Sequence, residues 1–313
     1  NITGKIDIEV KDNDIKELYY FANHYKKNKD YIKAIQFFEK IAQNGIDYAN
    51  GEIAYIYNQM KNKQKEEEYL NKINDLINIY KKITAKKCYE IQVPKNERIS
   101  CITDSSMHGT PYIPIGEEYP YSKDGKPLKL LIQINLRDIK LEGYPQKGIL
   151  QIYVEPDSRE PEYQIKYYED ITLLYQKDLP EAKELELWNF AQANSKIIFK
   201  ESITYMPLTD ERIETALKRA IKEYNQLIGI NLIKYNEDDL DNSDLLWYII
   251  DKKIKNYPLL LGGYADYWNI EHYTSKESLL KLMSDYETSV NVLISCKEIE
   301  KKDFNKAEIV FDS

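Results

Sequence analysis

Four prolines punctuate residues 109–127, and they restrict what this chain can fold into more than any other feature. Proline fixes φ, has no backbone N–H to donate, and disfavours helical geometry at the residue before it. The stretch ahead of Leu128 is therefore held extended and cannot begin a helix. The four residues are Pro111, Pro114, Pro120 and Pro127.

Two short strands are expected after the prolines. A Lys-Asp-Gly-Lys turn at 123–126 leads into 128–134, an apolar run with β-branched side chains that is typical of a strand in a sheet core. A second turn at 143–148 leads into 149–154, where apolar and polar residues alternate with the period of a half-buried strand. Together the two runs predict a hairpin.

The order of these parts resembles the first half of the YwqG-like family, a group of mostly bacterial α+β proteins without an established activity. The resemblance rests on the DGKP turn at 124–127, the QIN strand end at 133–135 and KGILQ at 147–151, and it resumes with LLGGY at 260–264. The pieces after that glycine pair are shortened relative to the family. The resemblance implies a mixed α+β domain over residues 83–313. Its motif residues carry over to Gly109, Pro111, Tyr112, Pro114, Gln133, Asn135, Gly148, Gln151, Gly262 and Gly263.

The two halves of this region also resemble each other. Segments 109–112, 130–135 and 149–154 align in order with 262–264, 279–283 and 290–294. A repeated order of turn, strand and strand is consistent with an internal duplication.

Residues 13–82 differ in kind, because they lack proline and place apolar and small residues at helical spacing. Two units match at an offset of thirty-two residues (53 − 21, 73 − 41), although Glu66 breaks the second. They resemble tetratricopeptide or Sel1-like helical hairpins, and residues 1–12 are interpreted as a strand remnant or linker. Two such units seldom bury enough surface alone, so they either dock on the α+β domain or follow further repeats.

In the tetratricopeptide resemblance, the first helix of each unit lines a concave surface that holds a partner peptide. Ordinary solvent-exposed helix positions remain the alternative interpretation. The partner-binding residues predicted by position are Lys16, Tyr19, Asn23, Lys26, Tyr48, Tyr55 and Asn58.

Between the two halves of the α+β region, helices are expected at 180–193, 210–229 and 244–254. The second has an apolar face that runs from Ile213 to Ile228. Trp188 and Trp247 are expected to pack inside these helices, against the sheet.

Groups suited to catalysis are scarce. The histidines are His24, His108 and His272; His108 follows Asp104-Ser105-Ser106, which is interpreted as a polar turn rather than a hydrolytic triad. The acidic run at 236–244 departs from a calcium-binding loop, and no nucleotide or zinc-protease motif is present. No catalytic residue, metal or cofactor is therefore assigned.

Charge and composition narrow the partners. Lys and Arg total 44 against 52 Asp and Glu, a net charge of −8 without a basic stripe, which argues against nucleic acid. No segment is apolar enough for a membrane span, and Cys88, Cys101 and Cys296 lack a disulfide or zinc spacing. A cytoplasmic protein with reduced thiols is expected.

Two functions fit these observations. The favoured one is a non-enzymatic protein-binding module, for which the family resemblance makes a role as an immunity or regulatory protein of a bacterial system conceivable. The alternative is a small-molecule sensor or enzyme with a pocket near 109–112 and 262–264, between the two halves.

Overall fold

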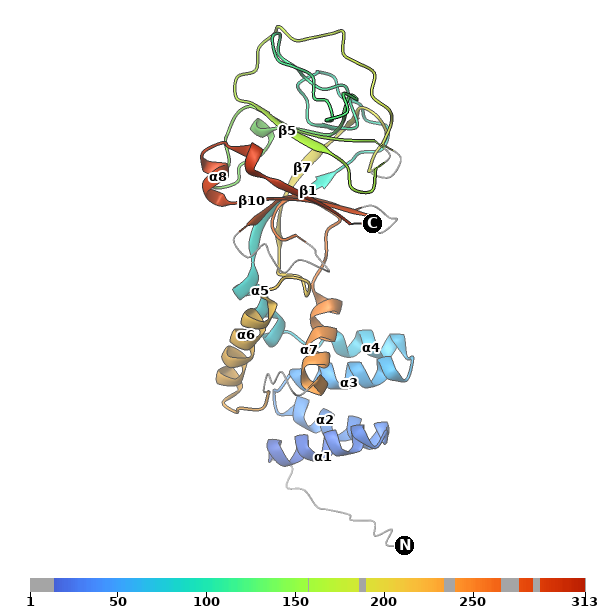
Figure 1. Cartoon of the computed structure of the whole chain (residues 1–313). Helices are drawn as coiled ribbons and strands as arrows, with labels where there is room; N and C mark the ends of the chain where they lie inside the picture. The colour runs from blue at the N-terminus through green and yellow to red at the C-terminus, as the bar shows by residue number, and fades with distance from the viewer. Residues whose placement is uncertain are drawn as a thin grey trace. The chain divides into compact units, whose positions relative to one another are not determined.

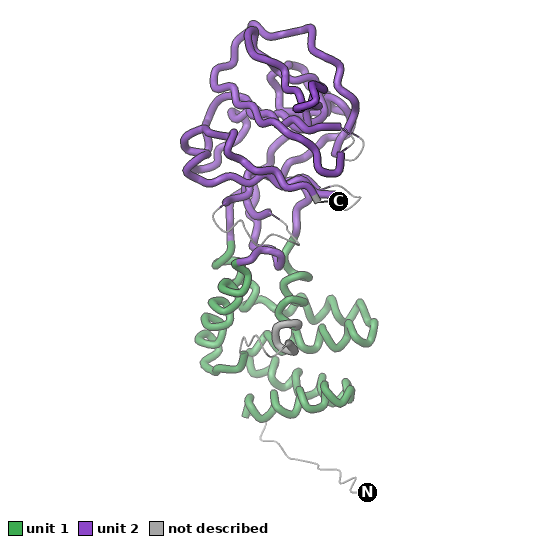
Figure 2. The backbone as a smooth tube through the Cα atoms, in the orientation of Figure 1, with its two compact units in different colours: residues 1–84, 212–255 green, residues 85–211, 256–313 purple. Residues whose placement is uncertain are grey.

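A computed structural model describes residues 14–156, 158–185, 190–233, 240–265, 276–283 and 288–312. The chain is α+β and divides into two compact units (Figures 1 and 2). The helical unit combines residues 1–84 with 212–255, and the sheet unit combines 85–211 with 256–313. Each unit is therefore built from two segments that lie far apart in the sequence. The acidic run at 236–244, the tail at 1–12 and Trp188 fall largely or wholly outside the described residues.

The first segment of the helical unit is a stack of antiparallel helices, as predicted (Figure 1). Side chains of Asp14 and Asp30 accept hydrogen bonds from backbone N–H groups at the starts of the first two helices, which satisfies donors that a helix leaves open. The helices are α1 (Ile15–Lys27), α2 (Tyr31–Gln43), α3 (Tyr48–Gln59), α4 (Lys63–Leu70) and α5 (Asp75–Thr84).

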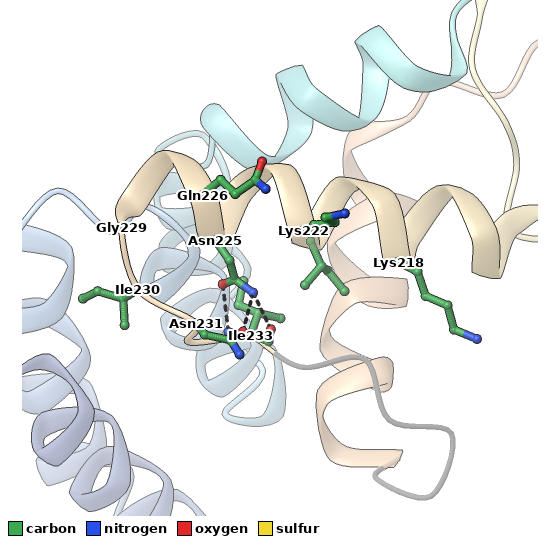
Figure 3. A pocket seen from close by; sticks show the side chains of 9 residues that line it. Lys218, Lys222, Asn225, Gln226, Gly229, Ile230, Asn231 and Ile233 are labelled. Atoms are coloured by element: carbon green, nitrogen blue, oxygen red, sulfur yellow. Dashed lines mark hydrogen bonds between the residues drawn. The ribbon is translucent and has the colours of Figure 1, made fainter.

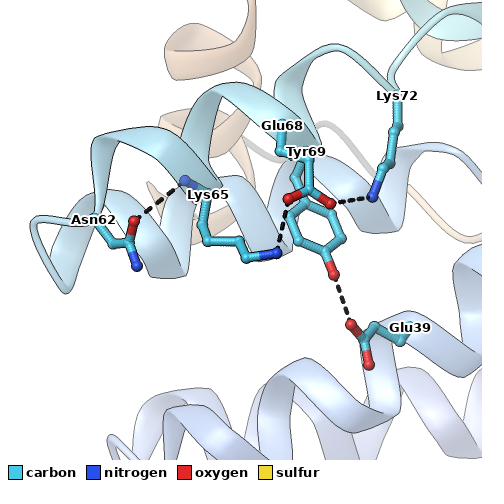
Figure 4. Close-up of polar contacts among 6 residues, drawn as sticks. All are labelled: Glu39, Asn62, Lys65, Glu68, Tyr69 and Lys72. Atoms are coloured by element: carbon cyan, nitrogen blue, oxygen red, sulfur yellow. Dashed lines mark hydrogen bonds and ion pairs between the residues drawn. The ribbon is translucent and has the colours of Figure 1, made fainter.

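Helix α4 is tied to α2 through polar side chains (Figure 4). Asn62 caps its start, Glu68 pairs with Lys65 at 2.7 Å and Lys72 at 2.9 Å, and Tyr69 donates to Glu39 of α2 at 2.6 Å. The ion pairs are exposed and contribute little, so the Tyr69 contact is the one that joins the two helices.

Helices α6 (Ile213–Ile228) and α7 (Leu240–Lys253) belong to the helical unit. Helix α6 packs on α5, and α7 packs on α3 and α4. The predicted apolar face of α6 is buried, but the expectation that these helices pack against the sheet is wrong, and Trp247 is 39% exposed. The amphipathic pattern shows that a helix has a buried face and does not identify what covers it.

Polar contacts of Tyr224 join helix α6 to the N-terminal helices. The Tyr224 hydroxyl donates to the Asp47 carboxylate at 2.8 Å and accepts from the backbone N–H of Tyr48 at 3.0 Å. The same carboxylate accepts from the backbone N–H groups of Asn74 and Asp75, both at 2.6 Å. One aspartate therefore links α3, α5 and α6.

The sheet unit consists of two antiparallel sheets (Figure 1). One has the strand order β11-β10-β9-β8-β1-β7, and the other has the order β5-β4-β3-β2-β6. The first sheet contains β1 (Lys86–Gln92), β7 (Ile198–Thr204), β8 (Leu259–Gly262), β9 (Glu277–Met283), β10 (Ser289–Ile294) and β11 (Glu308–Asp312). The second contains β2 (Ser106–Met107), β3 (Lys129–Asn135), β4 (Ile149–Val154), β5 (Tyr163–Tyr168) and β6 (Ser195–Lys196).

The main core lies where side chains of both sheets meet, and it includes Leu261 and Val292 of one sheet and Ile134 and Ile152 of the other. The predicted hairpin is confirmed as the antiparallel pair β3–β4. Strand β4 is buried along its whole length rather than on one face, because Tyr112 packs with Ile149 on the side away from the core. The helix expected at 180–193 is wrong, since its described residues are irregular.

The segment that joins β3 to β4 aligns with the segment that joins β10 to β11 at a constant offset of 160 residues (294 − 134, 309 − 149). Each begins with a short helix, η1 (Leu136–Asp138) or α8 (Cys296–Glu300), capped by the side chain before it. Ile139 and Ile299 are both buried at equivalent positions. This alignment makes β10–β11 the equivalent of β3–β4, whereas the alignment of the sequence alone made β9–β10 their equivalent. An internal duplication stays a prediction, with β10–β11 in place of β9–β10 as the second copy of the hairpin.

Candidate functional site

Three motif residues that are distant in the sequence meet in a buried hydrogen-bonded network. The Gln151 amide donates to the backbone carbonyl of Tyr112 at 2.8 Å and to Gln133 Oε1 at 2.6 Å. Gln133 Oε1 also accepts from the backbone N–H of Tyr112 at 2.9 Å, and the Tyr153 hydroxyl donates to Gln151 Oε1 at 2.9 Å. The side chains of Gln133 and Gln151 have no exposed surface, so this network is closed to solvent.

Strand β3, which carries Gln133, also holds the loop at 100–106 in place. Gln133 Nε2 donates to the backbone carbonyls of Ile102 and Asp104, both at 2.8 Å, and Asn135 Nδ2 donates to that of Thr103 at 3.0 Å. Buried polar groups with all their partners present fix one conformation of the chain. The motif polar residues therefore act on the structure of the loops that precede β3.

The motif glycines are closed in by protein atoms. A Cβ at Gly109 would lie 2.8 Å from Asn194 Oδ1, and one at Gly148, where φ is +99°, would lie 2.6 Å from the carbonyl oxygen of Tyr168. At Gly263, where φ is +85°, it would lie 2.6 Å from Thr204 Cγ2. Close approach and left-handed backbone explain these glycines, and neither requires a ligand.

In the loop with Asp104 and His108, both side chains accept hydrogen bonds from backbone N–H groups. The Asp104 carboxylate accepts from the backbone N–H groups of Ser100 and Cys101, both at 2.9 Å, as a turn residue does. His108 is 4% exposed, and its Nε2 accepts from the backbone N–H of Phe190 at 3.0 Å. Burial lowers the pKa of His108 to about 4, so its ring is neutral and the accepting nitrogen is already occupied.

On the helical unit, two of the predicted residues of α1, Lys26 and Tyr19, meet at a buried carboxylate of α3. Glu52, whose side chain is 1% exposed, accepts from Lys26 Nζ at 2.9 Å and from the Tyr19 hydroxyl at 3.1 Å. Lys26 Nζ also lies 6.0 Å from the centre of the Tyr55 ring. Lys26 therefore neutralises Glu52 and is held at the edge of an aromatic surface.

Helix α7 packs on α3 and α4 next to Tyr55. The Tyr248 ring meets Tyr55 edge-on at 5.5 Å, and its hydroxyl donates to Glu66 Oε1 at 2.7 Å. Asn58 Nδ2 donates to the same oxygen at 3.1 Å. The residue that breaks the sequence repeat is thus an acceptor for α7. Gly51 leaves room for α7, since a Cβ there would lie 2.4 Å from Ile249 Cδ1 and that side chain would have to shift.

A pocket of about 200 Å³ remains open beside this contact. The residues described as lining it include three lysines and two tyrosines, and none of them is acidic. They are Lys26, Lys27, Lys29, Tyr31, Tyr55, Ile56 and Gln59. Lys26 and Tyr55 were predicted from sequence, whereas Lys27, Lys29 and Tyr31 were missed because they lie at and beyond the end of α1, where repeat spacing gives no signal.

Residues 105–312 match the family model described as "Domain of unknown function (DUF1963)", which covers well over half of the chain. The chain belongs to the DUF1963 family. No curated protein matches it. The DUF1963 match begins just before β2 and contains both α6 and α7, so the family region extends into the helical unit. An N-terminal helical region precedes it.

The other predicted residues of this DUF1963 protein lie apart from the lysine-lined pocket. Tyr48 is fully buried and packs on Tyr224, Asn23 donates to the backbone carbonyl of Tyr19 at 3.1 Å, and Lys16 is exposed. None of them is among the residues lining the pocket.

Within the described part of the chain, no helix has both the length and the apolar character needed to cross a membrane.

Proposed function

We propose that this DUF1963 protein is a protein-binding module whose helical unit receives a carboxylate of a partner protein. The observation that supports it is the pocket of about 200 Å³ with Lys26, Lys27 and Lys29 on its wall. Lys26 is paired with Glu52, and Lys29 adds a positive charge to a lining that contains no acidic residue. A volume of this size fits one side chain or a chain end rather than a folded ligand.

The tyrosines and Gln59 suit the same ligand. Tyrosine rings provide rigid contact area at low entropic cost, and their hydroxyls and the Gln59 amide can donate to a carboxylate oxygen. Charge-assisted hydrogen bonds of this kind are about twice as strong as neutral ones. The pocket therefore favours an Asp or Glu side chain, or a C-terminal carboxylate.

The overall charge narrows the partner further. A net charge of −8 repels a strongly acidic protein at long range, so recognition depends on the local field of the lysines. The partner that fits is a neutral or basic protein with one projecting carboxylate. The resemblances to YwqG-like proteins and to tetratricopeptide hairpins support this role. A role as an immunity or regulatory protein of a bacterial system is one form of it that the family resemblance makes conceivable.

Affinity capture with the full chain tests the proposal. Removing the N-terminal helices would expose the faces of α6 and α7 that they cover, so charge reversal in the intact chain is the better perturbation. Wild-type protein is compared with Lys27→Glu/Lys29→Glu and with Lys123→Glu/Lys126→Glu, a control with the same charge change in an exposed turn of the sheet unit. Retained proteins are identified by mass spectrometry after carbodiimide coupling, which joins carboxylates to adjacent lysines.

The proposal predicts a partner that couples to Lys27 or Lys29 and is lost at least about tenfold with the pocket variant but not with the control. Equal retention by the two variants, or coupling only to lysines elsewhere, would exclude the pocket as the binding site.

A further inference from the structure

An aliphatic tip on the sheet unit is exposed to solvent to an unusual degree. Leu173 is 97% exposed, Leu174 is 69% exposed and Ile115 is 65% exposed. The three side chains come from two neighbouring loops, since the backbone N–H of Ile115 donates to the carbonyl of Leu174 at 3.4 Å. We name Ile115, Leu173 and Leu174 the aliphatic tip. Contiguous exposed apolar groups mark interaction sites more often than scattered ones do.

The tip is held in one conformation by the motif network. The Tyr112 hydroxyl accepts from the backbone N–H of Thr172 at 2.8 Å, and Tyr112 is itself fixed by Gln133 and Gln151. The Gln176 side chain donates to the carbonyl of Pro114 at 3.1 Å, and its backbone N–H donates to the carbonyl of Ile113 at 2.8 Å. A surface that is already ordered loses less entropy when it binds.

The charges beside the tip are mainly acidic. Glu117 and Glu118 follow Ile115 and are both exposed. On the other loop, Lys177 and Asp178 are adjacent and exposed, so their charges offset each other. The complement of the tip is therefore an apolar groove with a basic rim.

The helical unit of the same chain carries such a groove (Figure 3). It has a volume of about 750 Å³, and its apolar lining is Ile221, Ile230 and Ile233, of which Ile230 is half-buried and the other two are buried. Asn225, Gln226 and Asn231 add polar groups to the lining. Lys218 and Lys222 extend from α6 on its border, where Lys218 is in an exposed ion pair with Glu214 at 3.6 Å. This volume is within the range that accommodates several aliphatic side chains.

One wall of the groove is fixed by a single side chain. Asn225 Oδ1 accepts from the backbone N–H of Ile233 at 3.1 Å, and Asn225 Nδ2 donates to the Ile233 carbonyl at 2.7 Å (Figure 3). Gly229, with φ of +70°, ends α6 and turns the chain back towards Asn225. The isoleucine surface is thus preformed.

We propose that the aliphatic tip of one copy docks in the isoleucine groove of a second copy, with Glu117 and Glu118 facing Lys218 and Lys222. The two surfaces differ, so the contact is head-to-tail and extends into rings or short chains rather than stopping at a symmetric dimer. The contact area is small, which makes the association weak and dependent on concentration. Neither surface shares a residue with the lysine-lined pocket, so this inference is independent of the proposed function.

Sedimentation velocity over about a hundredfold range of concentration tests the proposal. The tip variant is Leu173→Ser/Leu174→Ser, and the groove variant is Lys218→Glu/Lys222→Glu; both change exposed side chains and leave the core intact. Ile32→Ser, at an exposed position on α2, is the matched control. Wild type and control are expected to self-associate, and each variant alone is expected to be monomeric.

Mixing the two variants identifies the contact. Each mixed pair retains one intact tip and one intact groove on different chains, so an equimolar mixture should form a dimer and nothing larger. A wild-type protein that is monomeric at every concentration, or a mixture that stays monomeric, would overturn the proposal. The proposal would also be overturned if either variant alone self-associated over the same range of concentrations as the wild type.

Discussion

At the scale of single residues, Gln133 joins more segments than any other motif side chain. It bonds to three backbone groups, those of Ile102, Asp104 and Tyr112. Gln133→Leu leaves the buried N–H of Tyr112 and the partly buried carbonyls of Ile102 and Asp104 without this partner, and a fully buried group in that state costs about 1–3 kcal/mol. We expect the free energy of unfolding to fall by at least about 2 kcal/mol in urea titrations. Gln146→Leu, at an exposed position, should leave it within about 0.5 kcal/mol of wild type.

His108 links stability to pH. Its pKa is about 4 in the folded protein and near 6.5 when unfolded, so the unfolded chain binds the proton first as the pH falls. The stabilisation is complete above about pH 6.5 and is lost between there and about pH 4, by about 1.4 kcal/mol for each pH unit. His108→Asn tolerates the positive φ of 51° at this position and removes the titrating group.

Urea titrations at pH 7, 6 and 5 compare the two proteins. Wild type should lose about 2 kcal/mol more than His108→Asn between pH 7 and pH 5. Parallel pH dependence of the two proteins would mean that the pKa of His108 is the same in the folded and the unfolded chain.

At the scale of elements, Ile249 of α7 packs against Gly51 of α3. Gly51→Leu places a side chain where Ile249 packs, and overpacking of this kind costs about 1–3 kcal/mol, more than the gain of up to about 1 kcal/mol in helix propensity. Amide hydrogen exchange should therefore rise in residues 240–253 and not in β3 or β4. Gln36→Leu, on an exposed position of α2, is the control. Unchanged exchange in α7 would show that Ile249 can move aside without cost.

Sequence patterns predicted single helices and strands better than they predicted the elements on which these pack. The spacing of α6 and the alternation of β4 identified a helix and a strand, because each follows from local periodicity. The packing of α6 on α5 could not be found this way, since an amphipathic face does not specify its cover. Lys26 and Tyr55 of the pocket came from repeat spacing, whereas Lys27, Lys29 and Tyr31 lie where that spacing stops. The aliphatic tip is set by the bonds of Tyr112 and Gln176 between loops, which no periodicity encodes.

At the scale of the whole molecule, the boundaries of the DUF1963 match differ from those of the two compact units. The DUF1963 match includes α6 and α7, yet these helices pack on α3, α4 and α5, which lie outside it. The lysine-lined pocket depends on this arrangement, since Tyr248 of α7 orients Tyr55 on its wall. The N-terminal helices and residues 212–255 therefore form one structural unit, and that is the central claim of this account.

Native-state hydrogen exchange of the intact protein tests that claim most directly. Segments of one cooperative unit open together and share one free energy and denaturant dependence of opening. Amides of α6 should therefore exchange with those of α3 and separately from those of β3 and β4. If α6 instead exchanged with β3 and β4, and α3 opened independently, the helical unit would not be built from these two segments.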